Sequence, residues 1–364
     1  MNKLKLVLPS ALTILLIVCS LHLYQAKATD SFPVYNVNTG LRYATIQSAI
    51  NAIQTKDGHT IRVEAGIYEE EIIIDKGVKI IGENPVSTKI YGDIHIISPN
   101  VTITNFNING VVSITACYCN ISYNIISGGI SLGKGYYGGS SYALYCIIQN
   151  NTIMNGEPAG INVYHAKNCS IIWNKIYNNS VGIALCFYTS SYSYGYSYDT
   201  ASHTEYFEVR GNLIHNNHVG IALYGRGHVI IENSVYNNSY ALWLTRYATE
   251  NIIYHNNFFD NEKQVSLPYQ EAANYWDNGY EGNYWDDYTG TDENHDGIGD
   301  IPYVIDLSNQ DNFPLMNPYT IPEFSSIIPF LSLFIILTAL TLYQKSVNDY
   351  TLSHIDTRQR SEQA

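Results

Sequence analysis

The sequence predicts an all-β chain built around a right-handed parallel β-helix, and three observations lead to this fold. One phrase of alternating apolar and polar residues returns six times with an asparagine at the same place. Where no insertion intervenes, the copies are 21 to 23 residues apart, the length of one solenoid turn with two or three short strands. Only 14% of the residues are charged and 33 are tyrosines, a composition that suits stacked strands. The marker asparagines are Asn124, Asn151, Asn174, Asn212, Asn233 and Asn256.

Equivalent residues of stacked turns should form rows along the solenoid, spaced about 4.8 Å apart. A buried asparagine can then hydrogen-bond the asparagines above and below it, which satisfies its amide among apolar neighbours. Cys119, Cys146 and Cys169 share another repeat position, and we expect them to form a buried row of inert thiols, with metal ligation as the alternative. The repeats are assigned to residues 58–270.

The segments that flank the repeats are expected to close its two ends. Residues 29–57 form an N-terminal segment with apolar residues at helical spacing. They predict an amphipathic helix that caps the open first turn, with its apolar face at Ile46, Ala49, Ile50 and Ile53. Residues 271–318 are rich in Asp, Tyr and Trp and form the closing segment.

Two apolar runs predict export and membrane anchoring. Residues 1–28 combine a basic start, an apolar run and a small-x-small site, the pattern of a cleaved signal peptide; an uncleaved anchor is the alternative. Residues 327–343 carry no charge and predict one transmembrane helix after a linker at 319–326, with a buried core helix as the alternative. Residues 344–364 are then a cytoplasmic tail, and the domain is displayed on the outside of the cell membrane.

The charge of the chain limits its partners. A formal net charge of −13 argues against nucleic acid and favours cations or neutral ligands. We therefore expect a polysaccharide, a surface glycan or an envelope protein as the partner, and contact with the membrane through the C-terminal helix.

Three stretches of the sequence resemble known β-helix proteins. The segment from Thr45 to Glu83 resembles the opening of pectin-lyase-like proteins. The asparagine repeats are similar to the family of carbohydrate-binding and sugar-hydrolase β-helices that includes the periplasmic copper-maturation protein NosD. Residues 283–292, 297–306 and 311–315 resemble the closing segment of archaeal NosD-like surface proteins. The resemblance spans about residues 42–316 and implies the fold; the activities of this family are mixed.

One stretch of the closing segment matches the first part of a calcium-binding loop. Oxygen-bearing side chains occupy loop positions 1, 3, 5 and 9, Gly297 occupies position 6, and a main-chain carbonyl would fill position 7. Position 12 is Tyr303 instead of a bidentate glutamate, and a polar turn is the alternative. The expected Ca²⁺ ligands are Asp292, Asn294, Asp296, Ile298 and Asp300.

Two aromatic clusters are candidate ligand contacts, because Tyr and Trp present flat apolar faces with a polar rim that can stack on sugar rings. The first is an insertion between repeats, and the second is a doubled Asn-Tyr-Trp-Asp phrase. The alternatives are a flexible loop for the tyrosines and coverage of the solenoid end for the tryptophans. The candidate residues are Tyr188, Tyr192, Tyr194, Tyr196, Tyr198, Trp276 and Trp285.

The sequence supplies no catalytic signature, because the charges in the repeats are isolated and no paired-aspartate motif is present. Arg210 and Glu232 can lie on adjacent turns, an arrangement that is more often a surface salt bridge. Copper is a further possibility implied by the family, although we expect solvated histidines instead. The histidines that would ligate it are His215, His218, His228 and His255.

Six Asn-x-Ser/Thr sequons are present, and we expect several to be blocked by burial in the asparagine-rich corners. They begin at Asn100, Asn120, Asn150, Asn168, Asn178 and Asn237.

Together these features predict a membrane-anchored surface β-helix that binds carbohydrate or envelope partners without catalysis, steadied by Ca²⁺. The first alternative is a polysaccharide lyase or glycoside hydrolase of the β-helix type. The second is a NosD-like accessory protein for copper enzymes.

Overall fold

A computed structural model describes residues 32–133, 142–185, 204–245, 247–268 and 273–321. In this part of the chain no helix is long and apolar enough to cross a membrane. The chain divides into two compact units, Met1–Tyr319 and Thr320–Ala364, and every described strand belongs to the first. The predicted signal peptide, transmembrane segment and tail lie outside the described residues, as do Tyr188, Tyr192, Tyr194, Tyr196 and Tyr198.

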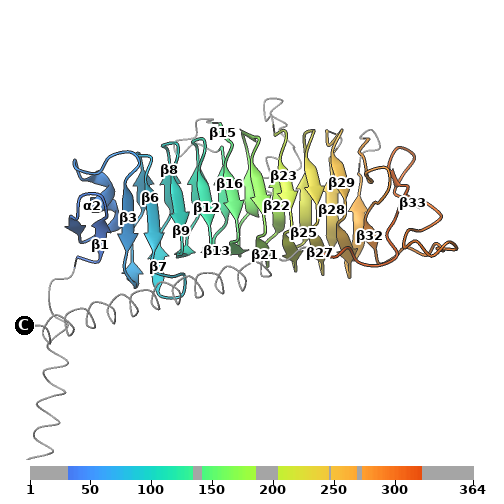
Figure 1. The fold of residues 1–364 in the computed structure, drawn as a ribbon, viewed down its shortest axis with the longest axis horizontal. Helices are drawn as coiled ribbons and strands as arrows, with labels where there is room; N and C mark the ends of the chain where they lie inside the picture. The colour runs from blue at the N-terminus through green and yellow to red at the C-terminus, as the bar shows by residue number, and fades with distance from the viewer. Residues whose placement is uncertain (1–31, 134–141, 186–203, 246, 269–272, 322–364) are drawn as a thin grey trace, which may run out of the picture. The chain divides into compact units, whose positions relative to one another are not determined.

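The strands form three large sheets, and each turn of the chain adds one strand to each sheet (Figure 1). From β3 onward the neighbours in the first sheet are parallel, while β1 pairs antiparallel with β2 and β3. In spatial order the first sheet holds β2 (Arg42–Tyr43), β1 (Val34–Asn36), β3 (Thr60–Val63), β6 (Lys79–Gly82), β9 (Thr102–Thr104), β12 (Asn120–Ser122), β16 (Ile147–Gln149), β20 (Ser170–Ile172), β23 (Glu208–Arg210), β26 (Val229–Ile231) and β29 (Ile252–Tyr254).

The second and third sheets follow the same order along the chain. The second holds β4 (Gly66–Tyr68), β7 (Thr88–Tyr91), β10 (Asn107–Asn109), β13 (Ile125–Ser127), β17 (Thr152–Met154), β21 (Lys175–Tyr177), β24 (Leu213–His215), β27 (Ser234–Tyr236), β30 (Asn257–Phe259) and β32 (Tyr284–Trp285). The third holds β5 (Ile72–Ile74), β8 (Ile94–Ile96), β11 (Val112–Ile114), β14 (Ile130–Leu132), β18 (Ala159–Val163), β22 (Val181–Leu185), β25 (Val219–Leu223), β28 (Tyr240–Leu244) and β31 (Lys263–Ser266). Smaller pairs are β15 (Ala143–Leu144) with β19 (Ala166–Lys167), and β33 (Tyr303–Val304) with β34 (Gln310–Asp311).

The register of the parallel strands repeats one inward residue in every turn. Ile121 in β12 pairs with Ile103 on one side and Ile148 on the other, and all three are buried. Branched apolar side chains pack well against such neighbours on a pleated surface, which is why the repeats favour isoleucine here. The prediction of an all-β parallel β-helix is confirmed.

A helix is present where the sequence predicts one, but it is shorter than expected. Helix α2 (Ile46–Asn51) begins at Thr45, whose side chain accepts a hydrogen bond from the Ser48 N–H in a capping box. Its buried face consists of Ile46, Ala49 and Ile50, and it contacts β1, β2, β3 and β5. Ile53 lies beyond the end of the helix and is 78% exposed, so its assignment to the buried face was wrong.

The solenoid extends further than the predicted boundary at residue 270. Strand β32 (Tyr284–Trp285) pairs in parallel with β30 and is the last strand of the second sheet. Tyr275 likewise forms an isolated parallel bridge with Ile252 of the first sheet. The first part of the closing segment therefore forms the final turn.

The marker asparagines form the predicted row of hydrogen bonds, and every donor points the same way along it. The side-chain N–H of Asn174 donates to Oδ1 of Asn212 (3.1 Å), and Asn212 donates to Oδ1 of Asn233 (3.0 Å). Each amide also donates to main-chain carbonyls, as Asn212 does to Ile171 (2.7 Å). The row continues past the predicted copies to Asn283, which donates to the carboxylate of Asp311.

Two further rows of side-chain amides have the same direction and also end at carboxylates. In one, Asn179, Asn217, Asn238 and Asn261 hydrogen-bond in series and reach Asp286 through Gln264. In the other, Asn251 donates to Asn274, whose main-chain N–H donates to Asn309, and Asn309 donates to Asp306. The closing segment thus supplies the terminal acceptor of all three rows, at Asp286, Asp306 and Asp311.

The predicted cysteine row is confirmed, and other residue types replace cysteine in later turns of the solenoid. Cys119, Cys146 and Cys169 are buried on consecutive turns, and the Cys146 N–H donates to Sγ of Cys169 (3.3 Å). The hydrogen bond that the Cys119 thiol donates to Cys146, together with burial, raises the pKa of Cys119. Two turns beyond Cys169 the position is His228, which is buried with its pKa lowered to about 4 by desolvation. The pKa of Cys169 is lowered by its hydrogen bond with Cys146, but burial of all three thiols and of a neutral imidazole at the same position indicates a packing role.

The carboxyl group of Asp311 makes folding stability depend on pH. Desolvation by burial raises its pKa to about 6, although Asn283, Trp285 and Phe313 donate to it. A raised pKa means that the folded state binds the proton more tightly than the unfolded chain. The stability from this group is therefore full below the unfolded pKa of about 3.9 and is lost as the pH rises through about 6.

We expect this loss to reach roughly 3 kcal/mol between pH 4 and pH 6, from about two pKa units at 1.36 kcal/mol each. The measurement is urea unfolding of the intact chain at each pH, compared with the Asp311→Asn variant. Since the lowered pKa of His228 acts with the opposite sign in the same range, the difference between the two curves isolates Asp311. A pH-independent difference would contradict the assignment.

Candidate functional site

The strongest candidate for ligand contact is a column of corner residues that precede the strands of the first sheet. We call Tyr118, Tyr145, Asn168 and Tyr206 the tyrosine edge; main-chain hydrogen bonds link each of these corners to the turn that follows. All four have left-handed backbone conformations, with φ between 54° and 58°, which turn their side chains outward. The three tyrosines are 49% to 58% exposed.

The rings of the tyrosine edge are ordered by their neighbours. Tyr118 and Tyr145 stack in parallel with ring centroids 5.3 Å apart. The Tyr206 ring lies against the backbone of Gly227, where a Cβ atom would come within 2.7 Å of it. Ordered, half-exposed aromatic rings lose little conformational entropy when a ligand packs on them.

A short strip of charged residues runs beside the tyrosine edge. Lys167, Glu205 and Arg226 occupy successive turns, joined by parallel bridges. Lys167 Nζ lies 2.9 Å from the Glu205 carboxylate, and Arg226 Nε lies 3.3 Å from it. The hydrogen bond from Lys167 lowers the pKa of Glu205, so the strip carries two cations around one ionised carboxylate. It offers donors for hydroxyl or carboxylate groups next to the rings.

The tyrosine edge was missed by sequence reasoning, although a signal for it exists. Each of its tyrosines directly precedes a residue of the buried row that contains Cys119, Cys146 and Phe207. Aligning the repeats on that row would have placed the tyrosines in one column. The predicted tyrosine insertion lies between Leu185 and Thr204, and Thr204 is followed by Glu205 of the charged strip.

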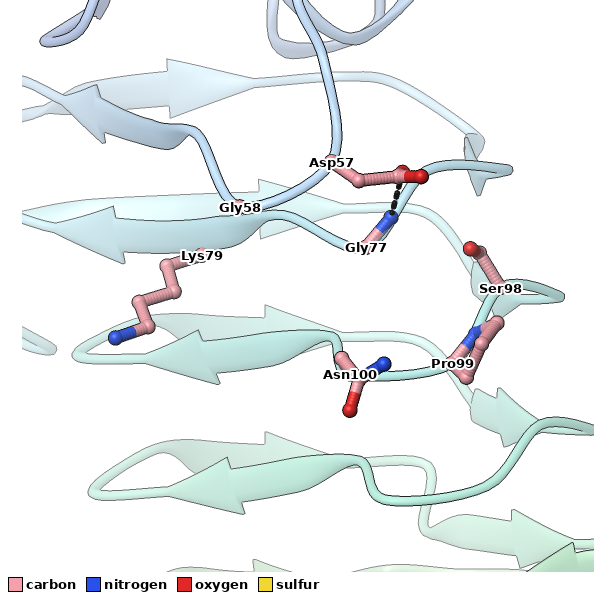
Figure 2. A pocket seen from close by; sticks show the side chains of 7 residues that line it. All are labelled: Asp57, Gly58, Gly77, Lys79, Ser98, Pro99 and Asn100. Carbon is pink, nitrogen blue, oxygen red and sulfur yellow. Dashed lines mark hydrogen bonds between the residues drawn. The ribbon is translucent and has the colours of Figure 1, made fainter.

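A hollow of about 530 Å³ lies near the start of the solenoid (Figure 2). Its wall combines Lys79 of β6 with the turn Ser98–Asn100 and with Asp57. The Asp57 carboxylate accepts a hydrogen bond from the Gly77 N–H (2.8 Å), so it holds two turns together. A single lysine and a structural carboxylate give this hollow no acid–base pair, and we favour the tyrosine edge.

A second cluster of titratable side chains lies at the end of β29. His255 Nε2 is 2.7 Å from the Glu281 carboxylate, and the His255 ring stacks on Tyr319 with centroids 4.0 Å apart. Burial, Glu232 and Glu281 raise the pKa of Tyr319. Arg210 lies 3.9 Å from Glu232, which confirms that these two residues are on adjacent turns. A histidine oriented by a carboxylate can exchange protons with a bound substrate.

Trp276 and Trp285 were expected to contact ligand, and the structure contradicts this. Both are 1% exposed, and Trp285 stacks between Phe258 and Tyr303. Its Nε1–H donates to Asp311 (2.9 Å), and that of Trp276 donates to Asn309 (3.1 Å). Neither ring has a free face, so the tryptophans close the solenoid core, which was the alternative.

The predicted calcium loop lies on the surface of the closing segment. The Asp292 carboxylate accepts hydrogen bonds from the N–H groups of Asp296 (3.2 Å) and Gly297 (3.0 Å). Gly297 has φ +89°, the left-handed turn that position 6 of such a loop requires. The backbone path at Gly297 therefore matches such a loop, but the carboxylates of Asp292, Asp296 and Asp300 do not converge on one cation position in the described part of the chain.

The four histidines considered for copper do not form one cluster. His215 stacks between Tyr177 and Tyr236, His228 Nε2–H donates to the Tyr224 carbonyl inside the solenoid, and His255 pairs with Glu281. His218 packs edge-on against Tyr240. Within the described ranges, no three His, Cys, Asp or Glu side chains are placed to hold a metal ion.

Two solved structures are similar to this chain over part of its length. The A-module of the mannuronan C-5 epimerase AlgE4 from Azotobacter vinelandii is 13% identical, with a TM-score of 0.40 over 61% of this chain and 68% of that one. The Dettilon tailspike protein (gp208) is 12% identical, with a TM-score of 0.34 over 59% and 58% of the two chains.

Sequence comparisons identify relatives more directly. A cell surface glycoprotein of Methanothermus fervidus is 29% identical over 82% of this chain and 61% of its own length. A probable ABC transporter binding protein NosD of Stutzerimonas stutzeri is 39% identical over 20% of this chain and 17% of its own, so the chain spans less than two thirds of either relative. Residues 189–290 match the family model for the periplasmic copper-binding protein NosD. These matches, together with the stacked asparagine turns, support the resemblance of this chain to NosD-like β-helix proteins.

Proposed function

We propose that this protein is a surface-displayed β-helix that binds a polysaccharide or another envelope glycan along the tyrosine edge, without catalysis. The carrying observation is the column of exposed, ordered tyrosines beside the Lys167–Glu205–Arg226 strip. The surface glycoprotein relative supports display outside the cell. In this proposal residues 1–28 direct export, residues 327–343 anchor the chain in the membrane, and helix α2 caps the first turn.

The chemistry of the edge suits a neutral or weakly acidic sugar chain. Tyrosine rings present apolar faces to the C–H groups of a sugar, and their hydroxyls exchange hydrogen bonds with its hydroxyl groups. Lys167 and Arg226 add donors without creating a strongly basic surface, because Glu205 lies between them. An envelope protein with exposed glycans would be bound through the same contacts.

Binding is tested with the full-length chain in detergent and a panel of labelled polysaccharides on a sizing column. We expect one polysaccharide to move to larger size, and Tyr145→Ala to weaken its binding about 10-fold, the loss of roughly 1.4 kcal/mol. Tyr280→Ala is the matched control, because Tyr280 is exposed in the closing segment, away from the edge. Equal affinity for both variants would rule out the tyrosine edge, and a polysaccharide that becomes shorter would indicate an enzyme.

The second candidate function is a polysaccharide lyase or glycoside hydrolase, and the His255–Glu281 pair beside Tyr319 favours it. If this were the activity, His255→Asn would abolish chain shortening while the circular dichroism spectrum stays that of the wild type, since asparagine adopts the left-handed backbone of this corner (φ 57°). The copper-accessory alternative rests on the family description, and the described residues bring no three metal ligands together for it.

We also propose that Ca²⁺ binds the loop of the closing segment, supported by its spacing of oxygen donors and by the φ of Gly297. Ligand binding to the folded state alone stabilises it, so 1 mM Ca²⁺ should raise the thermal midpoint by a few degrees and a chelator should reverse this. Asp292→Asn should abolish the response. The control is Glu293→Ala, whose exposed side chain is not among the proposed ligands; a midpoint that ignores Ca²⁺ would refute the site.

A further inference from the structure

The corner between the second and third sheets carries a second column of exposed residues. Asn155, Asn178, Asn216, Asn237 and Asp260 occupy this corner on successive turns, each with φ between 52° and 57°. The N–H of Asn178 donates to the carbonyl of Asn216 (3.1 Å), and that of Asn216 donates to the carbonyl of Asn237 (3.0 Å). These residues therefore share one backbone geometry and differ only in side-chain context.

The left-handed corner separates the exposed asparagine from its buried successor. Asn178 and Asn237 are exposed, whereas Asn179 and Asn238, which follow them, are buried in an amide row. We expected burial to block several sequons, but at these two corners it is the middle residue of the sequon that is buried. Asn178 and Asn237 are exposed as whole residues, and among the described residues their side-chain amides have no hydrogen-bond acceptor.

Two of the three central corners carry the acceptor motif. Ser180 and Ser239 follow Asn178 and Asn237 at the second position. Both are partly exposed where the third sheet begins, and Ser180 Oγ donates to the Glu157 carboxylate (2.7 Å). Asn216 has the same backbone and the same exposure but is followed by His218 at that position. The column thus contains its own internal control.

The remaining sequons are less distinctive. Asn120 lies within β12 and Asn150 is half-buried. Asn168 belongs to the tyrosine edge, and Asn100 lines the hollow of Figure 2. Replacing either of these exposed residues would therefore alter a second feature as well as the sequon. Asn178 and Asn237 lie in neither feature.

We propose that Asn178 and Asn237 are N-glycosylated on the exported protein and carry oligosaccharides two turns apart, about 10 Å along the solenoid. The co-reactant is a lipid-linked oligosaccharide, and the catalyst is a transferase of the host. Nδ2 of the asparagine forms a bond to the anomeric carbon of the sugar while the bond from that carbon to the lipid phosphate oxygen breaks. The phosphate leaves with the electron pair, Nδ2 loses one proton, and no atom is oxidised or reduced.

The glycans extend from the exposed amides without disturbing the fold, because the amide rows lie behind them. This proposal depends on export and is independent of ligand binding at the tyrosine edge. Failure of the polysaccharide assay would leave it intact.

The test is peptide mass spectrometry of the full-length chain made in a host that N-glycosylates its exported proteins, with a native glycoprotein of that host as positive control. We expect Asn178 and Asn237 to carry glycan mass. Asn178→Gln and Asn237→Gln should each remove one glycan from the intact mass, and the double variant should remove both. Asn216→Gln should change nothing beyond the substitution itself.

A variant that creates a new sequon tests whether the corner geometry is sufficient for glycosylation, whatever the local sequence. His218→Ser completes the motif at Asn216, and we expect it to add one glycan there. Unmodified Asn178 and Asn237 in a sample whose positive control is glycosylated would overturn the proposal. So would a His218→Ser protein that folds, as judged by an unchanged circular dichroism spectrum, and lacks the new glycan while the native sites carry theirs.

Discussion

Asn212→Ala is expected to lower the free energy of unfolding by roughly 4 kcal/mol, a large fraction of the stability of a typical domain. The Asn212 side chain accepts from the main-chain and side-chain N–H groups of Asn174, at 2.9 and 3.1 Å. It also donates to Ile171 O and Asn233 Oδ1. Truncation leaves the Asn174 N–H and the Ile171 carbonyl buried without partners, at about 1–3 kcal/mol each, and adds a small cavity.

Equilibrium urea unfolding of the intact chain measures this loss, and Asn216→Gly is the matched control. Asn216 lies four residues away on the same turn, is exposed and has φ 55°, which glycine adopts freely. We expect the control to stay within about 0.5 kcal/mol of the wild type. If the two variants lose equal stability, the amide row contributes no more than the surface corner.

Asp311→Ala is expected to cost roughly 3 kcal/mol at pH 7 and to loosen the closing segment before the rest of the solenoid. The carboxylate is the acceptor for the Asn283 N–H at 2.7 Å and for the indole N–H of Trp285 at 2.9 Å. Both donors are buried, and alanine satisfies neither. Part of the cost is offset because the variant no longer buries a charge whose pKa is raised to about 6.

Two measurements locate this effect. Tryptophan emission should shift to the red, because Trp276 and Trp285 become hydrated, and amide exchange should accelerate in residues 273–319 while β12 to β20 remain protected. Glu293→Ala in the same segment removes an exposed carboxylate and should alter neither signal. Uniform acceleration along the whole chain would show that Asp311 supports the fold globally and not as a local terminal acceptor.

The repeats made most of the fold predictable, because each copy of the phrase is independent support for the same register. The asparagine and cysteine rows follow directly from that register. Trp285 was misassigned for a reason that the repeats could have corrected: it lies two residues after Asn283, as Ile153 lies two residues after Asn151, and both positions face the core. We interpreted Trp285 from its aromatic side chain alone and did not consider its position in the repeat.

Asp311 could not be predicted in the same way. It follows Asn283 by 28 residues, through a segment that occurs once and has no period, and its contact with the row is a tertiary one. The tyrosine edge was partly predictable, because its residues recur at one repeat position but differ in type. Asn168 occupies this position between Tyr145 and Tyr206, and Gly227 occupies it on the turn after Tyr206. A rule based on residue type alone does not detect such a column.

The common direction of the amide rows makes the solenoid modular in length. A turn inserted between Asn212 and Asn233 would receive a hydrogen bond from one neighbour and pass an identical one to the next, so internal duplication or loss of a turn leaves no group unpaired. The two ends are not interchangeable with the middle, because only a residue that accepts without donating can finish each row, as Asp286, Asp306 and Asp311 do. Homologues of different length should therefore gain or lose whole turns upstream and keep one closing segment.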